Sequence, residues 1–600
     1  MGQRVAEKAV SFGPSLKRLV AQLGPEKFLV GVVIVVSAAA TLANAFGPII
    51  LARATDLIYT GATSGRGIDT GALALVIAEA LAVYVVSGVV MWLSGFLIND
   101  IVQRTVFRMR RDVAAKLDRL PIKFFDAQPR GELLSRVTND IDNIAQSMQQ
   151  TLAQMLTNVF TVIGVVGLMF VLSPPLAAIA LLTVPLAMVI TMLIGKRSQV
   201  QFVSMWKATG QLNGQVEEAF TGHALVKVFG RQREVARDFA KHNEALYSAA
   251  FKANVLSGII MPLMFFVGNL NYVVIAVVGS VWVASGALTL GAVQAFIQYA
   301  RMFTQPITQL AAMANLLQSG VASAERVFEV LDAAEEAQGG TAKLPAEVAG
   351  RVAFEHVSFA YDPAKPLISD LSLVAEPGST IAIVGPTGAG KTTLVNLLMR
   401  FYELDGGRIT LDGVDIADVP RRELRDEIGM VLQDAWLFGG TIRDNIAYGR
   451  PDASEADIRV AAEATYVDRF VHSLPHGYDT VIEEEGANIS VGEKQLITIA
   501  RAFLSDPSIL ILDEATSSVD TRTEVLVQRA MKALRGGRTS FVIAHRLSTI
   551  RDADVILVME DGAIVEQGDH ESLLAAHGAY WRLYQSQFAG ALTDEDEAAA

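Results

Sequence analysis

Long apolar stretches dominate the first 325 residues of this chain of 600 residues. A helix that crosses a bilayer needs about 20 mostly apolar residues. Six stretches are candidate spans: 28–51, 72–97, 152–172, 176–194, 255–282 and 288–303. Hydropathy alone does not decide whether the last stretch spans the membrane, because it contains Gln294, Gln298 and Arg301. Only 19% of the chain is charged, against about 25% in soluble domains, so buried helices of a soluble protein are the less favoured alternative.

The positive charges of this half of the chain predict its orientation. Lys and Arg gather in the N-terminal tail and in the two long connections 98–142 and 196–247, whereas the other connections carry almost none. Cytoplasmic loops are the ones enriched in these residues. An even number of spans places both termini on one side. The sequence therefore predicts a multi-pass protein of a prokaryotic inner or cell membrane with cytoplasmic N- and C-termini, and its first residues show no signal-peptide pattern.

The two long connections keep a helical pattern while they turn polar, so we expect the helices to continue into the cytoplasm. Each connection is interrupted near its middle, the first by Pro121 and the stretch 128–131, the second at 220–223 and 229–231. Proline and glycine break helices. The pattern predicts a short helix at the far tip of each hairpin.

A glycine-rich stretch, 385–392, stands between a short apolar run and a helical run. Its residues fit the P-loop pattern in the strand–loop–helix setting that the pattern requires. Successive backbone N–H groups of such a loop converge on phosphate oxygens at a helix N-terminus. We expect Lys391 to reach the β- and γ-phosphates and the Thr392 hydroxyl to bind Mg²⁺. The predicted nucleotide contacts here are Gly385, Pro386, Thr387, Gly388, Ala389, Gly390, Lys391, Thr392 and Thr393.

Two later apolar runs end in polar residues that suit the same chemistry. The run 508–512 is followed by Asp513 and Glu514, and the run 540–544 by His545. A carboxylate at the end of a strand beside a P-loop is placed for Mg²⁺, and the next one can orient and deprotonate the attacking water. We predict Asp513 as a metal ligand, Glu514 as the catalytic base and His545 as a γ-phosphate contact.

Taken together, these motifs resemble the ATP-binding-cassette (ABC) transporters, most closely the exporter type that fuses six spans to one cassette. The resemblance covers about residues 28–588. It implies that Tyr361 is the aromatic platform for adenine and that Asp520 belongs to the D-loop. It also implies that Gln433 senses Mg²⁺ and relays to the membrane domain, and that His545 is the switch histidine. The two interrupted tips resemble the coupling helices that dock on cassettes.

One motif departs from the family's pattern. The family signature is Leu-Ser-Gly-Gly-Gln, whereas this chain has Ile489, Ser490, Val491, Gly492 and Glu493. The resemblance implies that Ser490 and Gly492 contact nucleotide. Val491 adds bulk where backbone nears phosphate, and Glu493 adds a carboxylate near a polyanion. Tolerated drift and a weakened second ATP site both remain open.

The chain holds one six-span bundle and one cassette, and in the family ATP lies between the P-loop of one cassette and the signature of another. The resemblance therefore implies a dimer. A homodimer would carry the altered signature in both sites and a heterodimer in one. We favour a heterodimer with a second half-transporter.

The predicted fold is an all-α six-helix membrane domain with long cytoplasmic extensions, followed by an α/β P-loop domain. The limits that we expect are 1–27 for a cytoplasmic segment, 28–330 for the membrane domain, 331–350 for a linker, 351–588 for the cassette and 589–600 for an acidic tail.

The leading hypothesis is an ATPase, with ATP and Mg²⁺ as cofactors, that exports amphipathic drug-like or lipid-like substrates by alternating access. Lipid flipping or uptake on the same scaffold is the nearest alternative, and an ATP-gated channel is a remote one. A net charge of −13 argues against a nucleic-acid partner, and the lack of cysteine excludes disulfides and iron–sulfur clusters. Polar residues near the spans could line a pathway or join helices: Gln154, Asn158, Asn269, Asn271, Gln294, Gln298 and Arg301.

Overall fold

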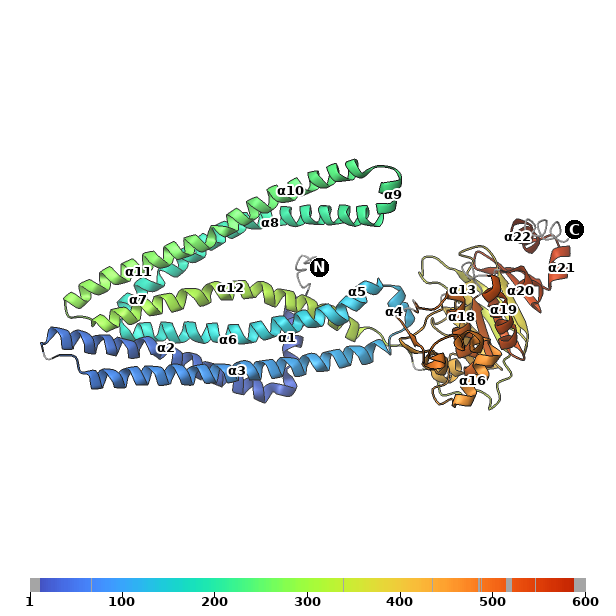
Figure 1. Cartoon of the computed structure of the whole chain (residues 1–600), viewed down its shortest axis with the longest axis horizontal. Helices are drawn as coiled ribbons and strands as arrows, with labels where there is room; N and C mark the ends of the chain where they lie inside the picture. The colour runs from blue at the N-terminus through green and yellow to red at the C-terminus, as the bar shows by residue number, and fades with distance from the viewer. Residues whose placement is uncertain are drawn as a thin grey trace. The chain divides into compact units, whose positions relative to one another are not determined.

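The computed structural model describes residues 11–65, 67–337, 339–433, 435–483, 486, 488–513, 521–544 and 546–587. The chain divides into two compact units (Figure 1). The first comprises Met1–Arg119 and Gln128–Ala333, and the second comprises Leu120–Ala127 and Ala334–Ala600. A short segment from the first long connection thus belongs with the C-terminal half of the chain.

Long helices make up the first unit (Figure 1). Its principal helices are α1 (Phe12–Ala21), α2 (Lys27–Thr63), α3 (Thr70–Leu117), α6 (Ile141–Leu172), α8 (Thr183–Thr221), α10 (Gln232–Gly258), α11 (Ile260–Ala284) and α12 (Leu290–Asp332). Shorter elements are η1 (Gly24–Glu26), α5 (Arg130–Ser135), the π-helix η2 (Arg136–Asp140), α7 (Pro174–Leu181) and α9 (His223–Val228).

Within the described residues, five helical segments are long and apolar enough to cross a membrane. They are Gly24–Thr63, Thr70–Leu117, Arg130–Leu172, Pro174–Thr221 and Gln232–Ala284. These contain the first five predicted spans. The sixth candidate, 288–303, lies in α12, which packs along α6 and α2 but is not among the helices that length and hydropathy identify.

Polar contacts join α12 to α2, and one of them involves Gln294 of the sixth candidate. Thr55 donates a hydrogen bond to the Gln294 side-chain oxygen. The Gly291 amide donates to Asp56 Oδ1 at 2.7 Å, and the Tyr299 hydroxyl donates to the Ala45 carbonyl at 2.8 Å. For Gln294 the structure therefore favours the helix-joining interpretation over a pathway lining.

The helices extend beyond their apolar stretches, as the sequence predicts. α3 runs on to Leu117, α8 to Thr221, and α10 starts at Gln232. A short helix lies at each interruption. α4 (Ile122–Asp126) follows Pro121, and α9 stands between α8 and α10 at the tip of their hairpin (Figure 1).

The strands of the second unit, among the described residues, form three sheets. The largest has the order β12-β11-β3-β10-β9-β6, with the strands Ala563–Gly568, Val555–Glu560, Thr380–Val384, Thr539–Ile543, Ile509–Asp513 and Ile428–Val431. Its strands are parallel except for the edge strand β12. The second has the order β2-β1-β4-β5, with the strands Ile368–Ala375, Val352–Phe359, Gly406–Leu411 and Val414–Asp415. The third pairs β7 (Gly440–Thr441) with β8 (Val481–Ile482).

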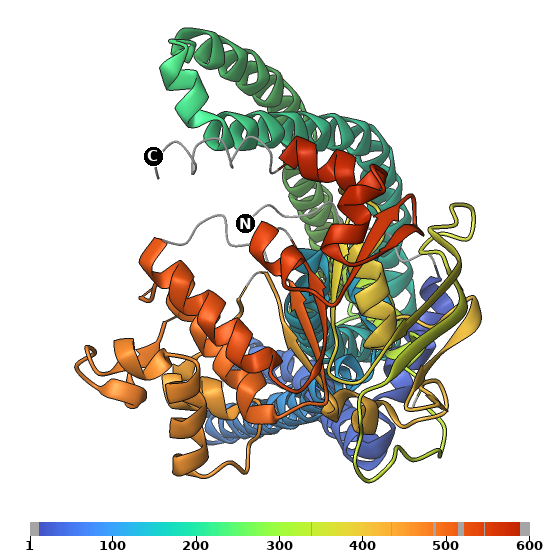
Figure 2. The ribbon, with the colours of Figure 1, turned by 90° about the vertical axis from the view of Figure 1, so that its right-hand side faces the viewer.

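Helices cover both faces of the parallel sheet (Figure 2). Ala382 and Val384 of β3 pack in one core with α18, whereas Ile381 and Ile383 pack in another with α13. A parallel strand buried on both faces reads as a continuous apolar run, which explains why 381–384 has no polar alternation. The helices are α13 (Lys391–Leu398), α14 (Arg421–Asp426), α15 (Ile442–Ala447), α16 (Glu455–Ala464), α17 (Val467–Val471), η3 (Gly477–Asp479), α18 (Val491–Ser505), α19 (Thr521–Arg535), α20 (Leu547–Arg551), α21 (His570–Ala575) and α22 (Ala579–Gln587).

Candidate nucleotide site

Strand register brings the predicted polar residues to one edge of the parallel sheet. Ile543 of β10 pairs with Ile383 of β3 on one side and with Asp513 of β9 on the other. Leu512 of β9 pairs with Val431 of β6. The carboxyl ends of these four strands therefore lie side by side, which is where open α/β sheets bind ligands. Three predicted residues, Glu514, Asp520 and His545, lie outside the described residues.

The loop after β3 adopts a backbone that glycine permits. Gly385 has φ +150°, and a Cβ built there would stand 2.1 Å from the Met559 carbonyl oxygen. Gly388 and Gly390 have φ values of +86° and +94°, in the left-handed region that favours glycine. Gly390 is the N-cap of α13. The chain thus turns sharply from β3 into the N-terminus of α13, where unpaired backbone N–H groups favour anions.

Lys391 lies at the start of α13 and folds back over the loop. Its Nζ donates hydrogen bonds to the carbonyls of Gly385 at 2.7 Å and Pro386 at 2.9 Å. Burial lowers the pKa of Lys391, and the charge of Asp513 at the end of β9 acts in the opposite direction. The ammonium and the predicted metal ligand are therefore near enough to influence each other.

Tyr361 follows β1 and lies beside α13. Its hydroxyl is 3.2 Å from the Thr393 hydroxyl, and the residue is 44% exposed. The ring packs edge to face on Phe359 and Tyr402, with centroids 4.9 and 5.0 Å away. Thr393 is buried, whereas Thr392 is exposed on the first turn of α13. The two aromatic neighbours hold Tyr361 beside the P-loop helix while part of its ring remains open to a ligand.

Tyr402 is a site residue that the sequence analysis missed. Its hydroxyl donates to Asp126 Oδ2 of α4 at 2.5 Å, within the second unit. A cavity of about 390 Å³ beside Tyr361 and Tyr402 is lined in part by Pro121 and Lys123. The only signal in the sequence is an aromatic pair, 401–402, just after the P-loop helix.

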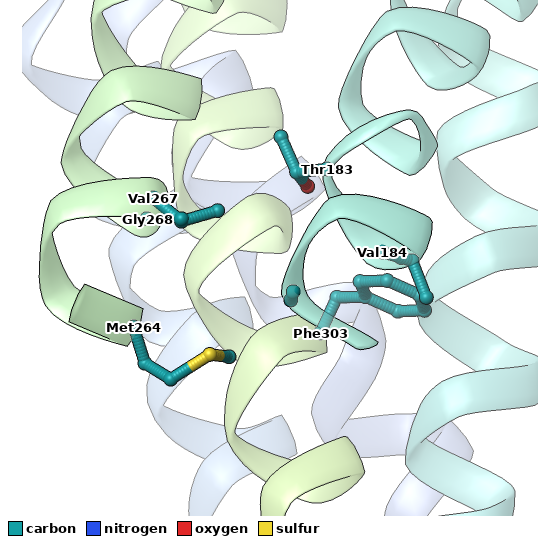
Figure 3. Close-up of a pocket in the computed structure, with 7 residues that line it drawn as sticks. Thr183, Val184, Met264, Val267, Gly268 and Phe303 are labelled. Atoms are coloured by element: carbon teal, nitrogen blue, oxygen red, sulfur yellow. The ribbon is translucent and has the colours of Figure 1, made fainter. Parts of the chain in front are cut away.

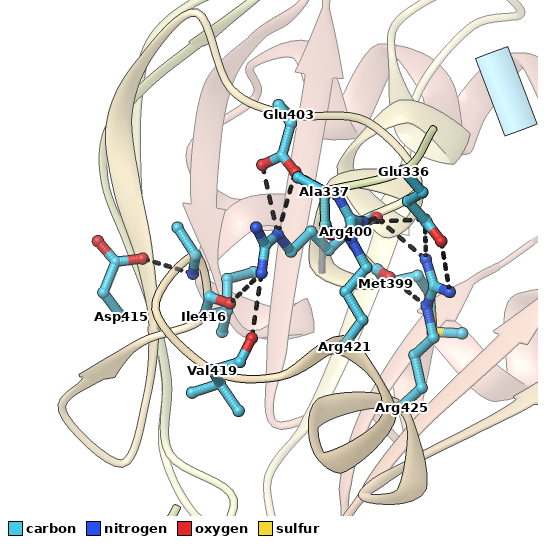
Figure 4. Close-up of polar contacts among 11 residues, drawn as sticks. Glu336, Ala337, Met399, Arg400, Glu403, Asp415, Ile416, Val419, Arg421 and Arg425 are labelled. Carbon is cyan, nitrogen blue, oxygen red and sulfur yellow. Dashed lines mark hydrogen bonds and ion pairs between the residues drawn. The ribbon is translucent and has the colours of Figure 1, made fainter. Parts of the chain in front are cut away.

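Arg421 and Arg425 bind the segment before β1, and Arg400 lies beside them (Figure 4). Arg421 Nη1 lies 3.0 Å from Glu336 Oε1, and Arg425 Nη2 lies 2.7 Å from the same oxygen. Arg400 donates to the carbonyls of Ile416 and Val419, both at 3.1 Å. Burial lowers the pKa of Arg421, while Glu336 opposes the shift. The predicted linker is therefore attached to the cassette at Glu336.

The altered signature forms the N-terminus of α18, and Glu493 is part of its cap. Ser490 is the N-cap, and its amide and hydroxyl donate to Glu493 Oε2 at 2.8 and 2.7 Å. The Glu493 amide donates in return to Ser490 Oγ at 3.3 Å. This is a capping box, which accepts either Glu or Gln at the third helical position. Gly492 is buried, and Val491 is 48% exposed.

Comparison with known proteins decides the family. Residues 30–307 match the family "ABC transporter transmembrane region", and residues 368–517 match the family "ABC transporter". The chain is an ABC transporter. A membrane region followed by a cassette in one chain is the arrangement of an exporter-type half-transporter, in which ATP hydrolysis is coupled to export. It is a multi-pass membrane protein that needs a second half to form a dimer.

Curated relatives cover nearly the whole ABC transporter chain. "Fatty acid ABC transporter ATP-binding/permease protein" of Mycobacterium bovis is 52% identical over 607 aligned positions, which cover 95% of this chain and 96% of the relative. "Uncharacterized ABC transporter ATP-binding protein YfiC" of Bacillus subtilis is 40% identical, covering 98% and 96%. "ATP-dependent lipid A-core flippase" of Syntrophus aciditrophicus is 38% identical, covering 85% and 84%.

Proposed function

We propose that this chain is one half of a dimeric exporter of lipid-like amphiphiles. In this dimer each ATP lies between the P-loop edge of one chain and the signature helix of the other. The main support for the nucleotide site is the register of the parallel strands β3, β10, β9 and β6. In this register the P-loop, Asp513 and the residues after β6 all follow strands that end at one edge of the sheet. Tyr361 beside α13 supplies a face for adenine.

The residue roles in this proposal follow the chemistry of each group. Lys391 neutralises phosphate charge, Glu514 activates water and His545 contacts the γ-phosphate. Thr392, Gln433 and Asp513 present the oxygen ligands that Mg²⁺ prefers. Among the described residues no group of three or more His, Cys, Asp or Glu could hold a metal. That fits Mg²⁺, which is usually bound by one or two protein ligands together with substrate phosphates and water.

The capping box supports a heterodimer in this proposal. Ser490 is the residue that the family's signature offers to ATP, and here its amide and hydroxyl both donate to the Glu493 carboxylate. A carboxylate binds these donors more strongly than a neutral amide does. The site that this chain's signature completes is therefore the weaker one. A partner chain with an unaltered signature would complete the other site, which uses this chain's P-loop.

We assign α4 and α9 as the coupling helices. α4 belongs with the cassette unit and holds Tyr402 through Asp126, so it is joined to the aromatic group around Tyr361. The tip around α9 instead exposes large apolar side chains, which a partner cassette would cover: Phe220 at 84%, Leu225 at 64%, Val228 at 78% and Phe229 at 71%.

The substrate class rests on the relatives. One is named as a fatty acid transporter and another as a lipid A-core flippase. Both names denote amphiphiles with long acyl chains. We therefore propose long-chain amphiphiles as the exported compounds, and the neighbouring alternative is their movement between leaflets.

The test is transport by purified protein in proteoliposomes, with this chain alone and together with a candidate second half-transporter. We expect ATP-dependent movement of labelled fatty acid or phospholipid, with ATPase activity that these compounds stimulate. Stimulation by cationic drugs but by no lipid would refute the substrate class. Full activity of the lone chain would refute the heterodimer.

A further inference from the structure

A cavity in the membrane domain lies between α11 and α12. Its volume is about 480 Å³, within the range of about 300–1,000 Å³ typical of small-molecule sites. Met261, Met264 and Phe265 give it an apolar part, and Tyr272 and Arg301 belong to its polar part. Residues 261 and 272 are 11 positions apart, which at 1.5 Å per residue separates the two parts by about 16 Å along α11. The cavity is therefore amphipathic along its length.

The apolar part continues toward α8. A smaller pocket of about 20 Å³ there is lined by Val184, Phe303 and neighbouring residues (Figure 3). Met264 and Gly268 line both this pocket and the larger cavity. A Cβ added at Gly268 would meet no atom within 4 Å. Position 268 therefore faces open space and can carry a side chain that fills the cavity.

Counted along the helices, Arg301 and Tyr272 lie well inside the hairpin of α11 and α12. Arg301 stands 11 residues after the start of α12, and Tyr272 stands 12 residues before the end of α11. At 1.5 Å per residue these are distances of about 16 and 18 Å along the helices. An ionisable residue within a membrane-spanning helix is costly to insert, so it is by default a functional residue.

Within the residues that the structure describes, Arg301 has a cation–π contact and no counter-ion. Its guanidinium carbon lies 5.6 Å from the centre of the Tyr272 ring, a cation–π contact. The ion pairs found among the described residues include none to Arg301. Among the described residues that line the cavity, Arg301 is the only charged one. The site thus offers one positive charge and planar N–H donors suited to a carboxylate.

We propose that Arg301 binds the carboxylate of a long-chain fatty acid whose acyl chain lies along Met261, Met264 and Phe265. One unit charge matches a carboxylate, whereas a phosphate monoester carries about −1.5 to −2 at neutral pH. The thioether and phenyl side chains give an adaptable apolar surface for the chain. This inference rests on the proposed export of lipid-like amphiphiles and adds the residue that selects the head group.

The experiment compares three ligands of equal chain length: palmitate, hexadecanol and hexadecyl phosphate. Binding of each radiolabelled compound is measured by scintillation proximity on the full-length transporter in nanodiscs, with empty nanodiscs as background. Arg301→Gln should lose about tenfold or more in palmitate affinity, because it removes a charge-assisted contact, and leave hexadecanol affinity unchanged. Arg301→Lys should retain most of the palmitate affinity, since it keeps the charge.

Two further variants separate the charge from the space. Gly268→Leu should weaken palmitate and hexadecanol alike, because it fills the cavity and leaves the charge of Arg301 in place. Arg53→Gln removes an arginine of the same domain that pairs with Glu79 outside the cavity, and it should leave palmitate affinity unchanged. Monodispersity and thermal melting confirm that each variant is folded.

The outcomes distinguish this inference from the proposed function. Equal palmitate affinity in wild type and Arg301→Gln overturns the role of Arg301, and leaves lipid export standing. Tighter binding of hexadecyl phosphate than of palmitate overturns the carboxylate assignment. A wild-type protein that binds none of the three compounds overturns the lipid-like substrate class, and this inference with it.

Discussion

Replacing Glu493 by Gln tests whether the altered signature restrains its ATP site. The amide keeps an oxygen that can accept from Ser490, so the capping box can persist, while the negative charge is lost. The two hydrogen bonds from Ser490 to Glu493, at 2.8 and 2.7 Å, then change from charge-assisted to neutral. No other contact of α18 needs to move.

The size of the effect follows from these two bonds. A hydrogen bond to a charged group contributes about 1.5–3 kcal/mol and a neutral one about 1 kcal/mol. Glu493 is only partly buried, so we take the low end, about 0.5 kcal/mol for each bond and about 1 kcal/mol for both. Since 1.4 kcal/mol is tenfold, Ser490 should become about fivefold more available to a γ-phosphate.

The assay is the ATP dependence of ATPase activity of the assembled transporter in nanodiscs. We expect the apparent KM for ATP at the affected site to fall by up to about fivefold. A matched control is Asp457→Asn, which makes the same change in the capping box of Ser454 on α16. It should leave KM unchanged. An unchanged KM in Glu493→Gln, with unchanged melting, would refute competition between Glu493 and nucleotide.

Three further changes test the nucleotide site. Lys391→Ala should weaken ATP binding itself, because it removes a charge-assisted phosphate contact; unchanged ATP affinity by calorimetry would count against the P-loop role. Tyr361→Ala should weaken ATP binding by about 1–3 kcal/mol, about 5- to 150-fold, because it removes a stacking face. Tyr361→Phe keeps the ring and loses only the 3.2 Å contact with Thr393. Equal losses of ATP affinity in the two variants would show that packing or the hydroxyl matters instead. Glu514→Gln should bind ATP and hydrolyse it very slowly, and near-wild-type turnover of the assembly would refute its role as base.

Local patterns predicted the parts of this protein that depend on local physics. The run 381–384 is apolar throughout because β3 is buried on both faces, and the glycines at 385 and 390 stand where the backbone admits no ordinary side chain. The helix breaks at Pro121 and Gly222 are also local, and each stands directly before a short helix, α4 and α9 respectively. In each of these places a few neighbouring residues suffice to set the conformation.

The contacts that sequence reasoning missed join residues far apart in the chain. Tyr402 and Asp126 are separated by 276 positions, and Arg425 and Glu336 by 89. Hydropathy also left the sixth span undecided, and the partner that Gln294 of α12 finds on α2 lies outside any window of sequence. Arg301 drew attention as a polar residue near a span, but only the fold shows that it lines a cavity with Tyr272.

Glu493 shows how a contact changes the meaning of a substitution. From the sequence its carboxylate is an added charge near a polyanion, and repulsion is the expected penalty. In the structure the same carboxylate occupies the amide and hydroxyl of Ser490, so occupation of the donors is a second penalty. The two differ in their response to salt. Repulsion between partly exposed charges is screened over about 3 Å at 1 M salt and about 8 Å at 0.15 M, whereas a hydrogen bond in direct contact is affected much less. If occupation dominates, the KM difference between wild type and Glu493→Gln should persist at high salt; a difference that vanishes there would assign the penalty to repulsion.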